Sequence, residues 1–297
     1  MTMDLMYLAV VFLFALLLLL GIGVWIGLAL MGCAWAAMTV FTDYTSGDAM
    51  ITAIWSSSTS WSLTALPLFI WMGEILYRTR LSENLFRGLA PWMTRLPGGL
   101  LHTNIVGCTL FAAISGSSAA TLTTVGKMTM PQLRKRNYSE KMVVGTLAGA
   151  ATLGLMIPPS LTLIVYGVTV NESLTKLFMA GVIPGLVLAG LFMGYIIIWS
   201  LIYDKEDHQA GEPRLTFIEK IKESRFLIPL VLLIALVIGS MYAGIATATE
   251  AAAIGAIGAF ALSVLQGDFS WQSCFEGLLG AVRTSAMIAL ILMGAAF

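Results

Sequence analysis

Residues 5–40 form an almost unbroken apolar stretch, and no other feature limits the possible folds of this chain as strongly. As a single helix the stretch would be about 54 Å long, whereas the hydrocarbon core of a bilayer is about 30 Å thick. We therefore expect two short spans that meet at a break over Gly21-Ile22-Gly23. Several later apolar runs also approach the length that crosses a bilayer. The sequence thus predicts an all-α integral membrane protein.

Composition supports the same fold class. Hydrophobic residues make up 58% of the chain and charged residues 11%, whereas soluble domains carry about 25% charged residues. The 16 basic and 16 acidic residues cancel, so no basic excess indicates a nucleic-acid partner. Cys33, Cys108, Cys274, His102 and His208 are isolated, and their spacing fits no disulfide framework or structural metal motif. No organic cofactor is expected.

The remaining apolar runs predict further spans, which cover residues 61–77, 142–170, 177–202, 226–242, 249–265 and a run that begins at residue 281. Residues 78–96 carry four arginines among apolar residues, a pattern typical of an amphipathic helix at the membrane interface. Four polar stretches are expected to be loops or interfacial segments, namely 41–60, 131–141, 203–225 and 266–277.

Residues 100–130 are apolar but are interrupted at their centre by Ser115-Gly116-Ser117-Ser118. Basic residues flank this segment on both sides, and cytoplasmic loops are the ones enriched in Lys and Arg. Two positive flanks argue against a single crossing. We therefore expect a re-entrant hairpin that enters and leaves on the cytoplasmic side, with the serine-rich turn at its tip.

This tip is a candidate binding site. Non-helical backbone at membrane depth persists only where it is buried in protein or lines a cavity, and Gly116 permits the turn. The hydroxyls of Ser115, Ser117 and Ser118 and the freed carbonyls are hard oxygen donors that suit Na⁺, while the following helix N-terminus favours an anion. The alternative is that these serines only pack at a helix interface.

Residues 154–160, with the sequence Gly-Leu-Met-Ile-Pro-Pro-Ser, form the expected companion segment. Pro158 and Pro159 remove two backbone donors and break the helix. The carbonyls of Thr152, Gly154 and Ile157 would then face the serine tip. The alternative is an ordinary proline kink.

An internal repeat is suggested by Trp71-Met72-Gly73, which recurs as Leu292-Met293-Gly294 after about 221 residues. An odd number of crossings between the two copies predicts that the second copy is inverted, as in many secondary transporters. The expected units are 1–98 (scaffold helices and interfacial arm), 99–170 (hairpin and broken helix), 171–224 (connecting span and cytoplasmic loop) and 225–297 (start of the inverted repeat). Matching the first repeat predicts roughly 120 further residues beyond Phe297, with a second hairpin and ion site.

Several motifs together resemble the large membrane subunit of the tripartite ATP-independent periplasmic (TRAP) transporters. They are Leu96-Pro97-Gly98-Gly99-Leu100, Ile114-Ser115-Gly116-Ser117-Ser118-Ala119-Ala120-Thr121, Leu147-Ala148-Gly149, Gly154-Leu155-Met156-Ile157-Pro158-Pro159-Ser160, Ala180-Gly181-Val182-Ile183-Pro184-Gly185 and Thr249-Glu250-Ala251-Ala252. The resemblance covers nearly the whole chain, in order.

The resemblance implies an elevator-type secondary transporter in the bacterial inner membrane, which imports small organic acids with Na⁺ as the coupling ion. It also implies a small four-helix membrane subunit and a periplasmic substrate-binding protein as partners. The implied Na⁺ ligands are Ser115, Gly116, Ser117, Ser118, Thr152, Gly154, Pro158 and Pro159. Ser117, Ser118, Thr121 and Ser160 are implied to line the substrate cavity.

Two other classes of function compete with this interpretation. A channel, or a permease component of a differently energised importer, would not need Na⁺. An intramembrane enzyme would need a titratable pair within the spans, and the sequence contains none. Glu74 is expected to pair with Arg78 or to reach the interface, Lys127 to reach the inner headgroups, and Glu250 to lie in the first turn of a Thr-capped helix.

Overall fold

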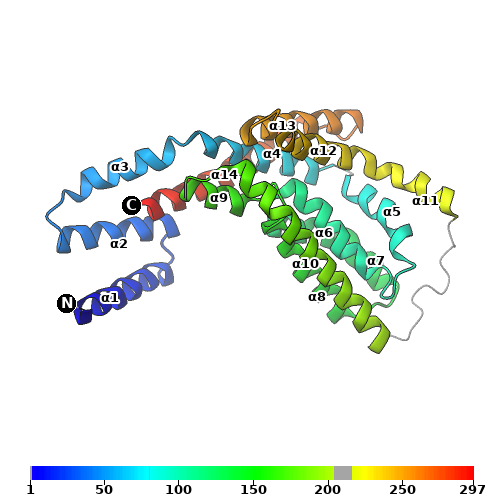
Figure 1. Ribbon diagram of the computed structural model, residues 1–297, viewed down its shortest axis with the longest axis horizontal. Coiled ribbons are helices and arrows are strands. Elements are labelled where there is room, and N and C mark those ends of the chain that lie inside the picture. The colour runs from blue at the N-terminus through cyan, green and yellow to red at the C-terminus, as the bar shows by residue number, and fades with distance from the viewer. Residues whose placement is uncertain (1, 80, 204–215) are drawn as a thin grey trace.

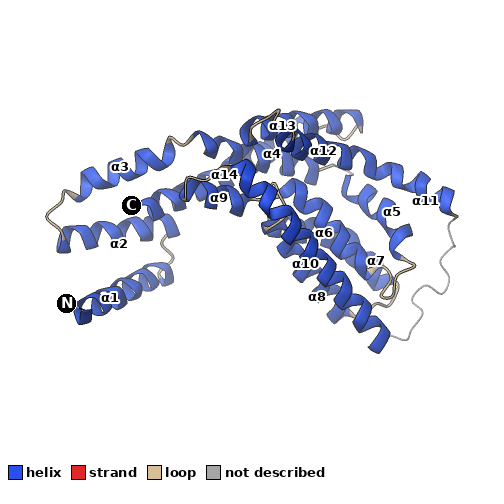
Figure 2. Cartoon of the chain, viewed as in Figure 1, coloured by secondary structure: helices blue, strands red, loops and turns tan. Residues whose placement is uncertain are grey.

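The computed structural model describes residues 2–79, 81–203 and 216–297, and these residues contain helices and no strands (Figure 2). The α-helices are α1 (Thr2–Gly21), α2 (Ile26–Phe41), α3 (Ser46–Ser58), α4 (Ala65–Tyr77), α5 (Leu81–Met93), α6 (Leu101–Ser115), α7 (Ser118–Lys135), α8 (Glu140–Ala151), α9 (Leu161–Thr169), α10 (Leu174–Tyr203), α11 (Phe217–Ser224), α12 (Ile228–Tyr242), α13 (Ala248–Leu265) and α14 (Trp271–Ala296). Short 3₁₀ turns are η1 (Trp61–Thr64), η2 (Thr152–Leu155) and η3 (Arg225–Leu227).

Four helical segments within the described residues are long and apolar enough to cross a bilayer. They are Leu174–Tyr203, Phe217–Tyr242, Ala248–Leu265 and Trp271–Ala296. Many of their large apolar side chains face outward, for example Ile183 and Ile257, which are 72% and 71% exposed. An all-helical chain with apolar outer surfaces fits an integral membrane protein, because a bilayer core requires every backbone polar group to be satisfied within the protein.

The N-terminal apolar stretch breaks where the glycines predicted it. Helix α1 ends at Gly21 and α2 begins at Ile26, and Gly23 between them has a φ of 92°. The prediction that residues 41–60 form a loop is wrong, because helix α3 occupies most of them (Figure 1). The polar residues make hydrogen bonds within this helix, where Thr45 donates to the Asp48 carboxylate in the first turn and Thr52 donates to the Asp48 carbonyl.

Three other predicted polar stretches are also partly helical. Helix α7 continues through Pro131 to Lys135, α11 lies within 203–225, and α14 starts at Trp271 inside 266–277. A proline removes only one donor from a helix, so the flanking hydrogen bonds of α7 persist around Pro131. Helix α11 begins with a Thr216–Glu219 capping box, which is a helix-start signal. Arg80 of the predicted interfacial helix lies outside the described part of the chain. The same holds for Lys205, His208 and Arg214 of the predicted 203–225 loop.

Helices α6, α7, α8 and α10 pack side by side around one apolar core, which includes Ile105, Val125, Leu147 and Ile196 (Figure 1). Buried Asn104 of α6 donates to the Thr146 hydroxyl of α8 at 2.9 Å. The hydrogen bond satisfies the side-chain nitrogen of Asn104, which would otherwise be costly to bury. This core holds the predicted hairpin and broken helix together.

A second core joins α4 with α12, α13 and α14 and includes Phe69, Met72, Leu233 and Ala252. Helices α2 and α14 cross closely at Gly27 and Gly294. A Cβ on Gly294 would lie only 2.3 Å from the Gly27 carbonyl oxygen. Small residues allow such crossings where membrane helices pack. Helix α4 also contacts α6, so the two cores adjoin each other.

Candidate ion and substrate site

The serine-rich segment forms a tight turn between two helices. Helix α6 ends at Ser115, Gly116 adopts a left-handed φ of 58°, and α7 starts at Ser118. Ser117 is the N-cap of α7, and its hydroxyl accepts from the Ala120 amide at 3.4 Å. The base of the hairpin closes where the Leu100 amide donates to the Tyr138 hydroxyl at 3.0 Å. The two ends of the hairpin therefore lie next to each other.

Hydroxyls and carbonyls converge inside this turn. The Ser115 and Thr121 hydroxyls are 2.9 Å apart, and both residues are buried. The Ser117 carbonyl accepts from the Thr121 hydroxyl at 2.8 Å and from the Ser115 hydroxyl at 3.4 Å. The tip thus concentrates neutral oxygen atoms in a buried position.

The companion segment breaks its helix as the double proline predicted. Helix α8 ends at Ala151, the turn η2 follows, and α9 starts at Leu161 after a cis Pro158–Pro159 peptide. Ser160 is the fully buried N-cap of α9, and its hydroxyl accepts from the Leu163 amide at 3.5 Å. It also donates to the Leu155 carbonyl across the break.

The two segments interlock. The Leu161 amide at the start of α9 donates to the Gly116 carbonyl at 3.1 Å. A Cβ on Gly116 would lie 2.5 Å from the Pro159 carbonyl oxygen, and a Cβ on Gly154 would lie 2.9 Å from the Ser117 carbonyl. Glycine at both positions therefore permits a backbone-to-backbone contact that a larger residue would block.

Most of the residues that the sequence singled out are brought together here. Ser115, Gly116, Ser117, Ser118 and Thr121 form the tip, and Gly154, Pro158, Pro159 and Ser160 form the break. Thr152 begins the turn η2 in the same break, and its exposed side chain donates to the Gly149 carbonyl of α8 at 2.6 Å.

The arrangement offers two kinds of binding chemistry. Helices α7 and α9 begin beside the same Gly116–Leu161 contact, so two positive helix ends meet there and favour an anion. The oxygen atoms are hydroxyls and carbonyls, and the described residues contain no cluster of three His, Cys, Asp or Glu side chains. Neutral oxygens of this kind, with half-helix ends, are the groups that coordinate Na⁺ in transporters with broken helices.

Comparison with known proteins decides the family. A sequence model described as the DctM component of the tripartite ATP-independent periplasmic transporter matches residues 11–297. The chain belongs to the DctM family. Its members among the relatives below are transporter permeases rather than enzymes.

Three curated DctM relatives resemble most of the chain. The isethionate TRAP transporter permease protein DctMQ of Oleidesulfovibrio alaskensis is 35% identical over 94% of this chain and 43% of the relative. The ectoine/5-hydroxyectoine TRAP transporter large permease protein UehC of Ruegeria pomeroyi is 31% identical over 84% of this chain and 57% of the relative. The C4-dicarboxylate TRAP transporter large permease protein DctM of Pseudomonas aeruginosa is 31% identical over 82% of this chain and 56% of the relative. The chain spans about half the length of these relatives.

Further contacts around the site of this DctM chain were not predicted from the sequence. A Cβ on Gly181 of α10 would lie 2.7 Å from the Met156 carbonyl, and one on Gly185 would lie 2.7 Å from the Ile157 side chain. A Cβ on Gly73 of α4 would likewise lie 3.0 Å from the Ser115 Cα. The pair Gly181 and Gly185 in the Ala180–Gly185 motif was the available signal, since glycines four residues apart mark a close helix contact.

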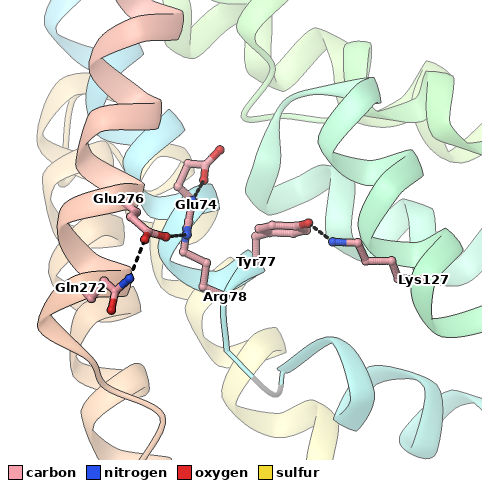
Figure 3. Close-up of polar contacts among 6 residues, drawn as sticks. All are labelled: Glu74, Tyr77, Arg78, Lys127, Gln272 and Glu276. Atoms are coloured by element: carbon pink, nitrogen blue, oxygen red, sulfur yellow. Dashed lines mark hydrogen bonds and ion pairs between the residues drawn. The ribbon is translucent and has the colours of Figure 1, made fainter.

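Charged residues near the site have local partners (Figure 3). Glu74 pairs with Arg78 at 3.4 Å as predicted, and Arg78 also pairs with Glu276 of α14 at 2.7 Å. Lys127 does not extend freely from the hairpin, because its amine donates to the Tyr77 hydroxyl of α4. The prediction for Glu250 is confirmed, since Thr247 caps α13 and accepts from the Glu250 amide at 3.3 Å.

Proposed function

We propose that this DctM-family chain is the large membrane subunit of a Na⁺-coupled, binding-protein-dependent secondary transporter that imports small organic acids across the bacterial inner membrane. The observation that carries the proposal is the interlocking of the hairpin tip with the broken helix at Gly116 and Leu161. Such discontinuous helices near the bilayer midplane hold the substrate and the coupling ion in many secondary transporters.

The ion and the substrate would use different atoms of this site. Na⁺ would bind among the Ser115 hydroxyl and the carbonyls near Gly116, Ser117 and Pro159, because the side chains there are uncharged. The substrate carboxylate would face the paired N-termini of α7 and α9 beside Ser117, Ser118, Thr121 and Ser160. A bound cation would also lower the cost of bringing a carboxylate into this buried region.

The names of the relatives support a small acidic substrate. Isethionate and C4-dicarboxylates, which two of those names mention, are small organic anions. The tripartite family description supports two partners, which we propose to be a small four-helix membrane subunit and a periplasmic substrate-binding protein.

The proposed transport step is an elevator movement. The unit of residues 99–170 would carry the site, residues 1–98 and 225–297 would form the surrounding scaffold, and residues 171–224 would connect them. The apolar core shared by α6, α7, α8 and α10 supports a hairpin and broken helix that move as one body.

The test is uptake of radiolabelled carboxylates into proteoliposomes that contain the full-length protein, its membrane partner and its binding protein. We expect uptake to require a Na⁺ gradient. Ser115→Ala, which removes the hydroxyl proposed to bind the ion, should raise the Na⁺ concentration for half-maximal uptake about tenfold, the effect of losing about 1.4 kcal/mol of ion binding. Ser139→Ala is the matched control, because Ser139 precedes α8 without a side-chain capping bond.

Uptake that is unaffected by Na⁺ would contradict the coupling mechanism and favour a channel or a differently energised importer. Na⁺-dependent uptake with the same half-saturation in wild type and Ser115→Ala would leave Na⁺ coupling intact but place the ion elsewhere.

A further inference from the structure

Helices α5 and α11 lie against each other at one end of the molecule (Figure 1). Arg87 of α5 pairs with Glu223 of α11 at 2.6 Å, and the Trp92 indole donates to the Ser224 hydroxyl at 2.7 Å. The edge of the Phe217 ring also packs on Trp92, with ring centroids 5.9 Å apart. Polar and aromatic contacts thus fix the relative position of the two helices.

Lys220 lies within this junction and has no counter-ion. Its side chain is only 5% exposed, and its amine lies 5.8 Å from the centre of the Trp92 ring. No acceptor for this amine occurs among the described residues, and Arg95 is close enough for the two cations to repel each other. Most of Lys220 is covered by its neighbours and its amine has no carboxylate partner among the described residues, so this unpaired charge favours a bound anion.

The acidic residues of α11 are already engaged. Glu219 accepts from the Thr216 amide at 2.7 Å in the capping box, and Glu223 is held by Arg87. Neither carboxylate is therefore available to neutralise Lys220. The anion that completes the junction would have to come from outside the described residues.

The surroundings of Lys220 indicate where that anion comes from. Phe217, Ile218 and Ile221 of α11 are 63%, 75% and 52% exposed, so the helix presents apolar side chains next to its basic ones. An amphipathic helix of this kind lies in the headgroup region of a membrane. The basic residues of 203–225 predict the cytoplasmic side, whose leaflet carries anionic lipids.

We propose that Lys220 and Arg95, beside Trp92, form a binding site for the phosphate headgroup of an anionic phospholipid. The phosphate oxygens accept from both cations, and the acyl chains cover the exposed apolar side chains of α11. Free phosphate has the same headgroup chemistry but would leave Ile218 and Ile221 uncovered. Bound lipid would fix the α5–α11 junction at the membrane surface.

Native mass spectrometry of the purified full-length protein tests this site. Phosphatidylglycerol and phosphatidylcholine are titrated separately against wild type, Lys220→Gln and Arg95→Gln, with Lys135→Gln as the control. Lys135 is an exposed cation at the end of α7, away from the junction. Each junction variant should weaken phosphatidylglycerol binding about fivefold, the usual contribution of one basic residue near an anionic surface. Phosphatidylcholine binding and the control should not change.

Equal loss in Lys135→Gln would mean that binding reflects overall charge and would overturn the proposal. Unchanged phosphatidylglycerol binding in both junction variants would also overturn it. Competition by millimolar inorganic phosphate would assign the site to free phosphate instead of lipid. Because Arg95 is exposed, Arg95→Gln remains informative if Lys220→Gln fails to fold.

Discussion

Gly154 is a residue of the candidate site at which added volume would meet backbone rather than a flexible side chain. We expect Gly154→Ala to lower the free energy of unfolding by about 1–3 kcal/mol, because the new Cβ would lie 2.9 Å from the Ser117 carbonyl and backbone cannot move as a flexible side chain can. The measurement is the thermal unfolding midpoint of the full-length protein in detergent.

Gly145→Ala is the matched control on the same broken segment. Nothing lies within 4 Å of a Cβ at Gly145, so alanine there should be neutral or stabilise α8 by up to about 1 kcal/mol. Equal midpoints for the two variants would show that Gly154 has no close backbone neighbour.

Single-residue chemistry explains which parts of the site the sequence could predict. Gly116 and the Pro158-Pro159 pair act on their own backbone, so their turn and break were predictable from local rules. The Leu161 amide and the Gly181 contact depend on which segments meet in space, and no local rule specifies that. The Thr152 carbonyl remains a predicted ligand, while the side chain of the same residue donates to the Gly149 carbonyl of α8.

At the scale of the elements, hydrophobic runs located helices well and polar runs located loops poorly. The hairpin and the broken helix were predicted because small polar residues or prolines interrupt apolar sequence there. Helices α3 and α11 were missed because their polar residues were interpreted as loop residues, although Asp48 and the Thr216–Glu219 pair are helix-start signals.

The base of the hairpin depends on one hydroxyl that links two elements. The Leu100 amide is buried at the start of α6, where no intrahelical acceptor is available, and Tyr138 after α7 supplies the acceptor. We expect Tyr138→Phe to destabilise the protein by about 1–3 kcal/mol, because it leaves a buried donor unsatisfied. Hydrogen exchange at the start of α6 should rise, which reports the loss locally.

Tyr166→Phe serves as the comparison, since Tyr166 of α9 is 54% exposed and its hydroxyl has no partner among the described residues. If both substitutions shifted exchange and unfolding equally, the hydroxyl of Tyr138 would not be closing the hairpin.

Across the whole molecule, two contacts in Figure 3 distinguish the proposed moving unit from the proposed scaffold. Tyr77 belongs to α4 and Lys127 to the hairpin helix α7, so their contact crosses the proposed boundary. Arg78 and Glu276 join α4 to α14, which both belong to the proposed scaffold. An elevator movement must separate the first pair, whereas the second pair can stay together throughout the cycle.

Cross-linking of these two pairs therefore tests the movement. Each pair meets through the ends of two long side chains, which is too far for a direct disulfide between cysteines, so a reducible bis-methanethiosulfonate reagent bridges them. In a background with the native cysteines, Cys33, Cys108 and Cys274 among them, replaced by alanine, cross-linking of Tyr77→Cys/Lys127→Cys should abolish uptake, and reduction should restore it. Cross-linking of Arg78→Cys/Glu276→Cys should leave uptake at the level of its reduced form, because that bridge lies within one unit. Full uptake by the cross-linked first pair would show that the hairpin does not move against α4 and would rule out the proposed boundary between the units.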